Sequence, residues 1–368
     1  MLTSILERGS WFVFKFGMPL VYFYHLIIGS VFFNTAAEDA KGLEKWGNVA
    51  LAPMQYFFEG KIASPIVDQE GRSTYILKRR FDYDNHFFMK TSASVIALPF
   101  SITVGGTLKT LAYLSPSTRE RANKIKGAIS VVSNLDYYQS IGIDIQDYKK
   151  AELIAPPKYK RRKEDGYRFA ADIEALKEIT HILNKYEIPF WIDCGSCLGA
   201  YQYGGTIPHD WDIDIAILRP DFQNVYNALQ ELDAKKFIVQ DWSGRAHPES
   251  YLKVYVRESA NMIDLYNFAI DEENQTISTL LSNEFNIFMP RDWVASEKRY
   301  TSPQSYHRIF PLKKALFEGI EVPVPSDIVT YLQTFYGENL APAKIYNEET
   351  CQYEKDETHP YWQTAHAH

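Results

Sequence analysis

Residues Trp191 to Ile217 read WIDCGSCLGAYQYGGTIPHDWDIDIAI, and this stretch decides the fold. The apolar run that ends at Ile192 predicts a short buried strand. The small residues from Cys197 to Tyr203 predict a helix, which the following Gly-Gly pair ends. Polar and apolar residues then alternate from Asp212 onward, which predicts a second strand. The predicted order is therefore strand, Gly-Ser turn, helix and strand.

Two acids share one face of the second predicted strand. Side chains two residues apart on a strand point to the same side, so Asp212 and Asp214 project together, while Ile213 and Ile215 pack on the other side. Paired carboxylates repel each other unless a cation lies between them, and a hard divalent ion such as Mg2+ (or Mn2+) suits oxygen ligands. We therefore predict a metal site in which one or two ions neutralise phosphate charge during group transfer.

The Gly-Ser step lies where the predicted helix begins. The N-terminus of a helix presents free N–H groups, so Gly195 and Ser196 are candidates to bind the phosphates of the same nucleotide. The alternative interpretation is an acidic surface strand beside a glycine-rich turn. We favour the catalytic interpretation because strand, turn, helix and acid pair occur together, whereas an Asp-x-Asp pair alone carries far less weight.

This stretch resembles the LicD-type transferase family, which includes fukutin and fukutin-related protein. The family pattern is Gly-(Thr/Ser)-x-Leu-Gly-Ala, a basic residue, and then Gly-x-Ile-Pro-x-Asp-x-Asp-Ile-Asp-Ile. The matching residues are Gly195, Ser196, Leu198, Gly199, Ala200, Gly205, Ile207, Pro208, Asp210, Asp212, Ile213, Asp214 and Ile215. The resemblance implies an α+β fold with a polymerase-β-like nucleotidyltransferase catalytic domain, in which helices flank a mixed sheet.

Three positions depart from the family pattern. Gln202 stands where an Arg is common, His209 where a Trp is common, and Trp211 where a further Asp is frequent. The first departure weakens any assignment of the side chain that holds phosphate there, although Gln202 and Asp210 remain candidates for binding it. The acid pair itself is intact.

A third acid lies on a later predicted strand, Met262 to Phe268, where Asp264 stands among apolar residues. Nucleotidyltransferases of this fold take a third metal-coordinating carboxylate from a neighbouring strand, so the resemblance implies that Asp264 completes the metal site. The alternative is a hydrogen-bonded or partly exposed strand residue. In the metal site Asp264 would also be a candidate to accept the proton of an attacking hydroxyl. Arg245 and Lys253 are candidates to hold phosphate, with ordinary surface cations as the alternative.

The chain has 368 residues, which suggests about two domains. The resemblance begins at an amphipathic helix predicted for Ala171 to Tyr186 and includes a later Phe-Glu-Gly segment. We predict an accessory module of unknown role at 1–155, a charged linker at 156–169, a LicD-like catalytic domain at 170–345 and a polar tail at 346–368. The tail histidines, His359 among them, are expected to be exposed.

Two long runs in the N-terminal module contain no Asp, Glu, Lys or Arg. The first, 16–37, is long enough to cross a bilayer, but a buried core helix and a cleaved secretory signal are alternative interpretations. The second, 91–108, contains Pro99 and a Gly-Gly pair, and we predict that these interrupt it too much for an ordinary spanning helix. A re-entrant or surface-lying hairpin and a packed pair of elements are the alternatives.

Composition limits the function classes. The net charge of −7 argues against nucleic-acid binding, which needs a basic surface. Three cysteines cannot cross-link a domain of this size, and we predict that Cys194 and Cys197 are buried thiols rather than half of a zinc site or a redox pair. Low cysteine content fits a reducing compartment, so the expected location is cytoplasmic or membrane-associated, at the cytoplasmic face or at a Golgi/ER-type membrane in a eukaryote.

The leading hypothesis is a metal-dependent transferase. The resemblance implies a CDP-activated donor, such as CDP-choline or a CDP-polyol, whose diphosphate would bind across Asp212, Asp214 and Asp264. A hydroxyl of a glycan or glycolipid would then attack phosphorus. The alternatives are a nucleotidyltransferase that adds NMP from an NTP to a small molecule or protein, and a non-catalytic scaffold on the same fold. A membrane surface is a further expected partner.

Overall fold

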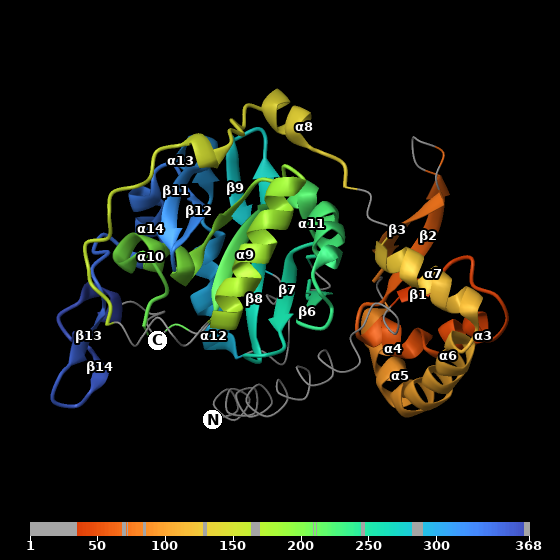
Figure 1. Cartoon of the computed structure of the whole chain (residues 1–368). Coiled ribbons are helices and arrows are strands. Elements are labelled where there is room, and N and C mark those ends of the chain that lie inside the picture. Colours follow the sequence, from red (N-terminus) through yellow and green to blue (C-terminus); the bar gives the residue numbers. More distant parts are fainter. Residues whose placement is uncertain are drawn as a thin grey trace. The chain divides into compact units, whose positions relative to one another are not determined.

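The computed structural model describes residues 35–67, 71, 73–83, 86–127, 131–162, 170–208, 210, 212–243, 247–281 and 290–363. These residues form two compact units, 35–132 and 133–363 (Figure 1). The boundary lies upstream of the one predicted at residue 155. The difference arises because the segment after Val132 packs on the C-terminal unit, where Ile154 N–H donates to Lys314 O at 2.9 Å.

A seven-stranded mixed sheet forms the centre of the C-terminal unit. Strand β8 is the longest, and it pairs with β5 along one edge and with β7 and then β9 along the other. The β5–β8 pair is parallel and the other pairs are antiparallel. The strands are β4 (Phe190–Ile192), β5 (Ile213–Leu218), β6 (Phe237–Asp241), β7 (Tyr251–Val256), β8 (Asn261–Asp271), β9 (Thr276–Thr279) and β10 (Gln304–Ser305).

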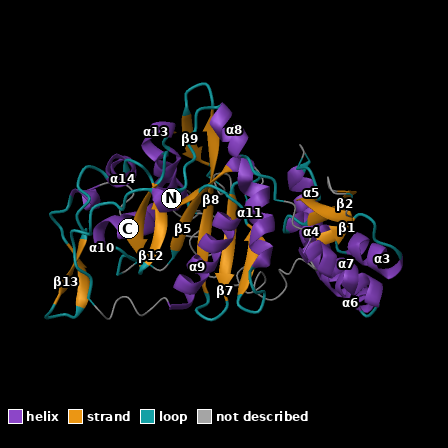
Figure 2. Ribbon diagram, turned by 45° about the horizontal axis from the view of Figure 1, so that its top comes forward, coloured by secondary structure: helices purple, strands orange, loops and turns teal. Residues whose placement is uncertain are grey.

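Helices and a hairpin surround this sheet (Figure 2). The helices are α8 (Leu135–Ser140), α9 (Ala170–Lys185), α10 (Cys194–Tyr203), α11 (Phe222–Ala228), α12 (Arg291–Glu297), α13 (Tyr306–Ile309) and α14 (Ile328–Tyr336). Strands β11 (Lys313–Phe317) and β12 (Ile320–Val324) form one hairpin, and β13 (Lys344–Asn347) and β14 (Gln352–Lys355) form another. This is the mixed α+β arrangement predicted from the sequence.

The central strands of the sheet are buried on both faces. All six residues of β5 and all six of β7 are buried, so these strands pack against elements on each side. Trp191 on β4 is fully buried, with its ring 5.1 Å from that of Phe268 and 5.8 Å from that of Phe310. Amphipathic α9 covers one face with its buried leucines and isoleucines, as the 3.6-residue spacing predicts.

The described parts of the predicted linker and tail, 156–162 and 346–363, make specific contacts. Arg161 forms an ion pair with Glu318 and donates to the carbonyl of Thr206 at 2.8 Å, so this part of the charged segment packs on the domain. The tail forms the β13–β14 hairpin, and His359 is only 4% exposed. The prediction that His359 is exposed was wrong, because Tyr361 N–H donates to its Nδ1 and folds the chain over it.

The N-terminal unit combines a three-stranded sheet with helices. The strands are β1 (Thr35–Ala37), β2 (Lys61–Val67) and β3 (Ser73–Arg79), and the helices are α3 (Gly42–Ala50), α4 (Ala52–Phe57), α5 (Phe87–Phe100), α6 (Gly106–Tyr113) and α7 (Pro116–Gly127). Most of the uncharged run 16–37 lies outside the described residues. Its last three residues form β1, which pairs in parallel with β2.

The second uncharged run forms one continuous helix. Elements α5 and α6 are joined by a π-helical segment, Ser101–Gly105, and together they make a 27-residue helix, Phe87–Tyr113, whose length and apolarity would suffice to cross a membrane. The prediction that Pro99 and the glycines interrupt the run was wrong. Proline removes one helical donor, but the π-helical segment shifts the hydrogen bonding around it. Membrane contact by this helix stays a prediction.

Candidate active site

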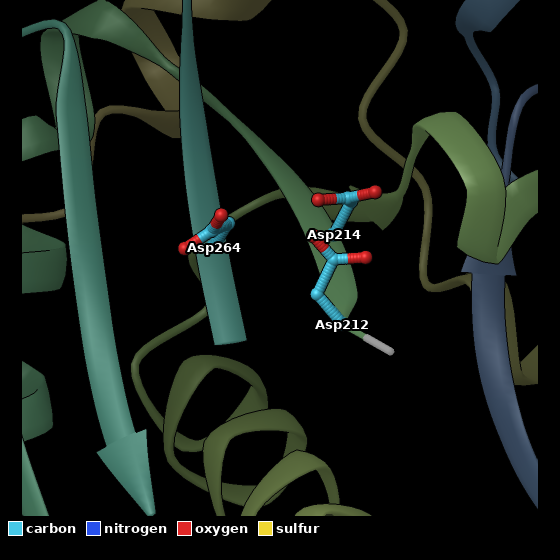
Figure 3. Close-up of side chains that lie close together, drawn as sticks. All are labelled: Asp212, Asp214 and Asp264. Carbon is cyan, nitrogen blue, oxygen red and sulfur yellow. The ribbon is translucent and has the colours of Figure 1, made fainter. Parts of the chain in front are cut away.

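The three predicted metal ligands lie together at one end of the paired strands β5 and β8 (Figure 3). Asp214 and Asp264 are direct partners in the parallel ladder, so their side chains leave the sheet on the same face. Asp212 precedes β5 and points to the same space. One carboxylate oxygen from each of the three residues lies within 4.8 Å of the others. The two separate sequence segments therefore meet at one point.

These acids repel one another in a poorly solvated place. Asp214 is 6% exposed and Asp264 is 4% exposed. Burial, together with the charges of Asp210 and Asp264, raises the pKa of Asp212 to about 8. Burial and the charges of Asp212 and Asp264 raise the pKa of Asp214 well above its usual range. A divalent cation would remove this repulsion, and three carboxylates are the ligand chemistry that Mg2+ or Mn2+ takes. The residues present therefore fit the metal.

Lys253 lies beside the acids as a counter-ion. It is the cross-strand partner of Asp264, and its Nζ lies 3.0 Å from Asp264 Oδ1. The ammonium group is 5.0 Å from the ring centre of Tyr251 and 5.6 Å from that of Trp242, which places it in a largely buried setting. Lys253 was predicted to hold phosphate, and its present contact is with a metal-binding candidate.

The start of α10 fixes the backbone of Asp214 from both sides. Asp214 N–H donates to Ser196 Oγ at 2.9 Å, and Asp193 N–H donates to Asp214 O at 2.9 Å. Ser196 is buried, so its hydroxyl oxygen supports the acid strand in this structure. The Gly-Ser turn and the acid pair are thus one hydrogen-bonded unit, which explains why the two motifs stand so close in the sequence.

Asp193 is a buried acid behind this unit that the sequence interpretation missed. Tyr331 Oη donates to Asp193 Oδ1 at 2.6 Å, and Trp191 Nε1 donates to Tyr331 Oη at 3.2 Å. Burial raises the pKa of Asp193 to about 6, and the hydrogen bond from Tyr331 opposes the rise. Its position between a buried strand and a helix start was the available signal, but its partner on α14 lies 138 residues away.

Asp210 lies against the turn at the start of α10. A Cβ atom added to Gly195 would collide with Asp210 Oδ2, so only glycine leaves space for this carboxylate. Asp210 also lies close enough to Asp212 to help raise the pKa of its carboxyl group. Gly195 and Asp210 were both predicted to contact phosphate. The structure places these two residues next to each other at the edge of the acid cluster.

Two further charged residues come from the segment before β10. Burial raises the pKa of Glu297 to about 7, with Arg299 opposing the rise and Asp212 and Asp264 reinforcing it. Glu297 ends α12, and Arg299 follows in a 3-10 helix. No local sequence pattern marks either residue, because their relation to the acids depends on a long-range chain reversal.

The other predicted site residues have different placements. Gln202 is buried and its side-chain amide donates to Leu340 O at 2.9 Å, so its visible role is to anchor the chain after α14. Arg245 lies outside the described residues. Cys194 and Cys197 are free, buried thiols, as predicted, and burial raises the pKa of both well above the usual range.

Comparison with known proteins agrees with this geometry. Residues 187–327 match the family model described as LicD/FKTN/FKRP, nucleotidyltransferase domain, and this range contains all three acids. The resemblance inferred from the Gly-Ser and Asp-x-Asp motifs is confirmed. The LicD-family match ends before β13, so the C-terminal hairpin lies outside it.

Three relatives illustrate the range of similarity. A Rickettsia prowazekii protein named RP689 is 28% identical over 194 residues, which are 53% of this chain and 64% of that protein. Human ribitol 5-phosphate transferase FKRP is 25% identical over 169 residues, 45% of this chain and 30% of FKRP. Human ribitol-5-phosphate transferase FKTN is 37% identical over 51 residues, 14% of this chain and 11% of FKTN. The chain thus spans less than two thirds of each of these relatives.

Proposed function

We propose that this chain is a metal-dependent transferase that moves a phospho-group from a CDP-activated donor to a hydroxyl of a glycan or glycolipid. The phospho-group would be of the polyol-phosphate or phosphocholine type. The observation that carries the proposal is the convergence of Asp212, Asp214 and Asp264 within 4.8 Å, inside the LicD-family match. The names of FKRP and FKTN, both ribitol-5-phosphate transferases, support the polyol-phosphate class of donor.

In this proposal Asp212, Asp214 and Asp264 hold one or two Mg2+ or Mn2+ ions. When bound, such ions would neutralise the charge of the diphosphate and polarise the phosphorus. Lys253 holds the Asp264 carboxylate in position through its 3.0 Å ion pair. Ser196 holds Asp214 in place through its 2.9 Å hydrogen bond, so that the carboxylates are positioned before the donor arrives.

We assign proton removal from the acceptor hydroxyl to Glu297. Asp264 was the candidate from the sequence, but its carboxylate already forms a 3.0 Å ion pair with Lys253 and is assigned here to the metal. Burial, reinforced by the charges of Asp212 and Asp264, raises the pKa of Glu297 to about 7, which suits a general base near neutral pH. Replacement by glutamine is expected to lower kcat by about 100-fold and to flatten the rise of kcat/KM with pH near neutrality.

A donor screen tests the proposed reaction. Purified protein with Mg2+ or Mn2+ would be incubated with CDP-ribitol, CDP-choline, CDP-glycerol and NTPs, together with a glycan acceptor. Release of CMP from a CDP-linked donor is expected, and Asp212→Ala should abolish it. Asp144→Asn is the matched control, because Asp144 is an exposed acid of the same unit that lies outside the cluster.

The alternative function gives a different product. A nucleotidyltransferase would release pyrophosphate from an NTP and would transfer label from the α-phosphate to the acceptor. A scaffold would bind neither metal nor nucleotide in calorimetry. Either result, obtained with wild-type protein whose folding has been verified, would contradict the proposed transferase.

A further inference from the structure

Two lysines face each other on the C-terminal hairpin, outside the LicD-family match. Lys344 on β13 and Lys355 on β14 are cross-strand partners. Like charges opposite each other destabilise an antiparallel pair. Among the described residues, no carboxylate lies within ion-pair distance of either lysine. The hairpin therefore keeps two adjacent positive charges at a cost to its own stability, which is typical of a site that binds an anion.

A tryptophan holds these two lysines close together. The Nζ atom of Lys355 lies 4.3 Å from the ring centre of Trp362, and that of Lys344 lies 5.7 Å from it. The indole Nε1 of Trp362 donates to Ala343 O at 2.9 Å, which fixes the ring against the start of β13. Cation–π contacts of this kind restrict the lysine side chains without neutralising their charge.

The chain links this hairpin to the acid cluster. Just before β13, Leu340 O accepts the side-chain amide of Gln202 on α10, the helix whose first turn holds Asp214. The hairpin lies on the α10 side of the sheet in both general views (Figure 1, Figure 2). Burial and Lys355 lower the pKa of Lys344, and Asp210 opposes this, so the ammonium group feels the charge of the cluster.

The residue before Trp362 makes a second link. Tyr361 contributes to the raised pKa of the Arg299 guanidinium, and Arg299 follows two residues after Glu297 in the segment beside the acids. Two separate positions of the C-terminal segment, Lys344 and Tyr361, are thus within electrostatic reach of groups that belong to the site.

We propose that Lys344 and Lys355, positioned by Trp362, form the subsite for the diphosphate of a nucleoside-diphosphate-linked donor. This inference rests on the proposed function and adds the residues that hold the donor. The acids bind cations and repel a bare diphosphate, so a donor needs positive charge beyond the metal. Two ammonium groups side by side match two adjacent phosphates, as in other charge-assisted phosphate contacts. The same chemistry would accept free pyrophosphate.

Calorimetry with the whole chain tests the subsite. CDP would be titrated into wild-type protein in the presence of Mg2+, and the dissociation constant compared with that of Lys344→Gln/Lys355→Gln. We expect binding to weaken by about 10- to 100-fold and its salt dependence to decrease, because two cation–phosphate contacts are lost. Mn2+ binding without nucleotide should stay unchanged, which would also show that the double variant is folded.

Two further variants make the result specific. Lys344→Arg/Lys355→Arg keeps both charges and should keep CDP affinity within about threefold. Lys177→Gln/Lys235→Gln removes two exposed lysines elsewhere in the same unit and should leave CDP affinity unchanged. Equal CDP affinity of the wild type and Lys344→Gln/Lys355→Gln would overturn the inference. An equal loss in the Lys177→Gln/Lys235→Gln control would overturn it too.

Inorganic pyrophosphate separates this inference from the proposed function. If wild-type protein binds pyrophosphate through the two lysines but neither binds nor turns over CDP-linked compounds, the anion subsite stands and the proposed donor is wrong. If wild-type protein turns over CDP-linked donors and the double glutamine variant does so with unchanged KM, the transferase stands and the lysine subsite is wrong. If wild-type protein binds neither pyrophosphate nor CDP, both fail.

Discussion

The two ends of strand β5 each carry a buried acid, and their surroundings differ. At the start, Asp214 is 6% exposed and its carboxyl group has other acids as neighbours. Beyond the end, Asp221 is 1% exposed and accepts hydrogen bonds from Asn134 at 2.6 Å, Tyr138 at 2.6 Å and Asn224 at 2.9 Å. Burial alone therefore does not distinguish a structural acid from a functional one. The neighbours do: hydrogen-bond donors satisfy Asp221 within the fold, whereas Asp214 faces other acids, whose charge a bound cation would offset in the proposed function.

Replacing the acid near each end of β5 by asparagine is the sharpest test of this difference. Asp214→Asn should lower transferase activity by at least about 1000-fold, about 4 kcal/mol, because a metal ligand is lost. The metal-free variant should nevertheless unfold at a higher temperature than metal-free wild type at pH 7.5, because the raised pKa of Asp214 makes its ionised form costly in the folded state. Enzyme assays and thermal unfolding measure the two effects. A less stable metal-free variant would contradict the comparison.

Asp221→Asn should have the opposite profile. The new amide group would bring an N–H donor to a place where the side chains of Asn134, Tyr138 and Asn224 already donate. We expect a loss of about 2–3 kcal/mol in the free energy of unfolding, measured with urea, and unchanged Mn2+ affinity. Weaker metal binding with unchanged stability would mean that Asp221 belongs to the functional site.

The pH dependence of stability should reflect the crowded acids near the start of strand β5. The folded-state pKa values of Asp193, Glu297 and Asp212 are raised to about 6, 7 and 8. When the pKa of an acid is higher in the folded state than in the unfolded state, the acid stabilises the fold fully below its unfolded-state pKa, near pH 4. This stabilisation is lost as the pH rises through the folded-state pKa. The melting temperature of metal-free protein should therefore fall by roughly 10–20 °C between pH 5.5 and 8.5. Saturating Mg2+ should remove most of this fall, and an equal slope with and without Mg2+ would argue against a metal at these acids.

The smallest expected effect is that of the residue that supports Asp214. Ser196→Ala would leave the buried Asp214 N–H without its acceptor, at a cost of about 1–2 kcal/mol in stability. Mn2+ affinity should fall several-fold because the carboxylate is held less firmly. Calorimetry gives both the affinity and the number of ions bound. Unchanged stability with lost nucleotide binding would instead favour the phosphate-binding role predicted from the sequence.

Local patterns were sufficient to predict the centre of the molecule. The alternation of polar and apolar residues from Asp212 to Ile217 and around Asp264 predicted the two strands. The helical spacing of apolar residues before β4 predicted α9. Both signals are local because they reflect burial of one face of the element. The family resemblance implied that Asp264 comes from a neighbouring strand to join Asp212 and Asp214, and the register places it opposite Asp214. The finer polymerase-β-like assignment stays a prediction.

The remaining features depend on contacts between distant segments. The ion pair of Lys253, the proximity of Glu297 and the burial of His359 follow from how the chain returns to the sheet, which no local period encodes. The helix Phe87–Tyr113 was missed for a different reason. Proline was given its usual weight as a helix breaker, but hydrogen bonds rearranged over one π-helical segment accommodate it.

The parallel ladder between β5 and β8 has one more consequence. Asp214 and Asp264 are opposite each other because of backbone register, and Lys253 meets Asp264 through the register of β7 with β8. Inserting a single residue into β8 ahead of Asp264 would turn its side chain to the other face, even though no residue of the site had been replaced. Variation in length within these strands is therefore more damaging to this centre than most changes of side chain around it.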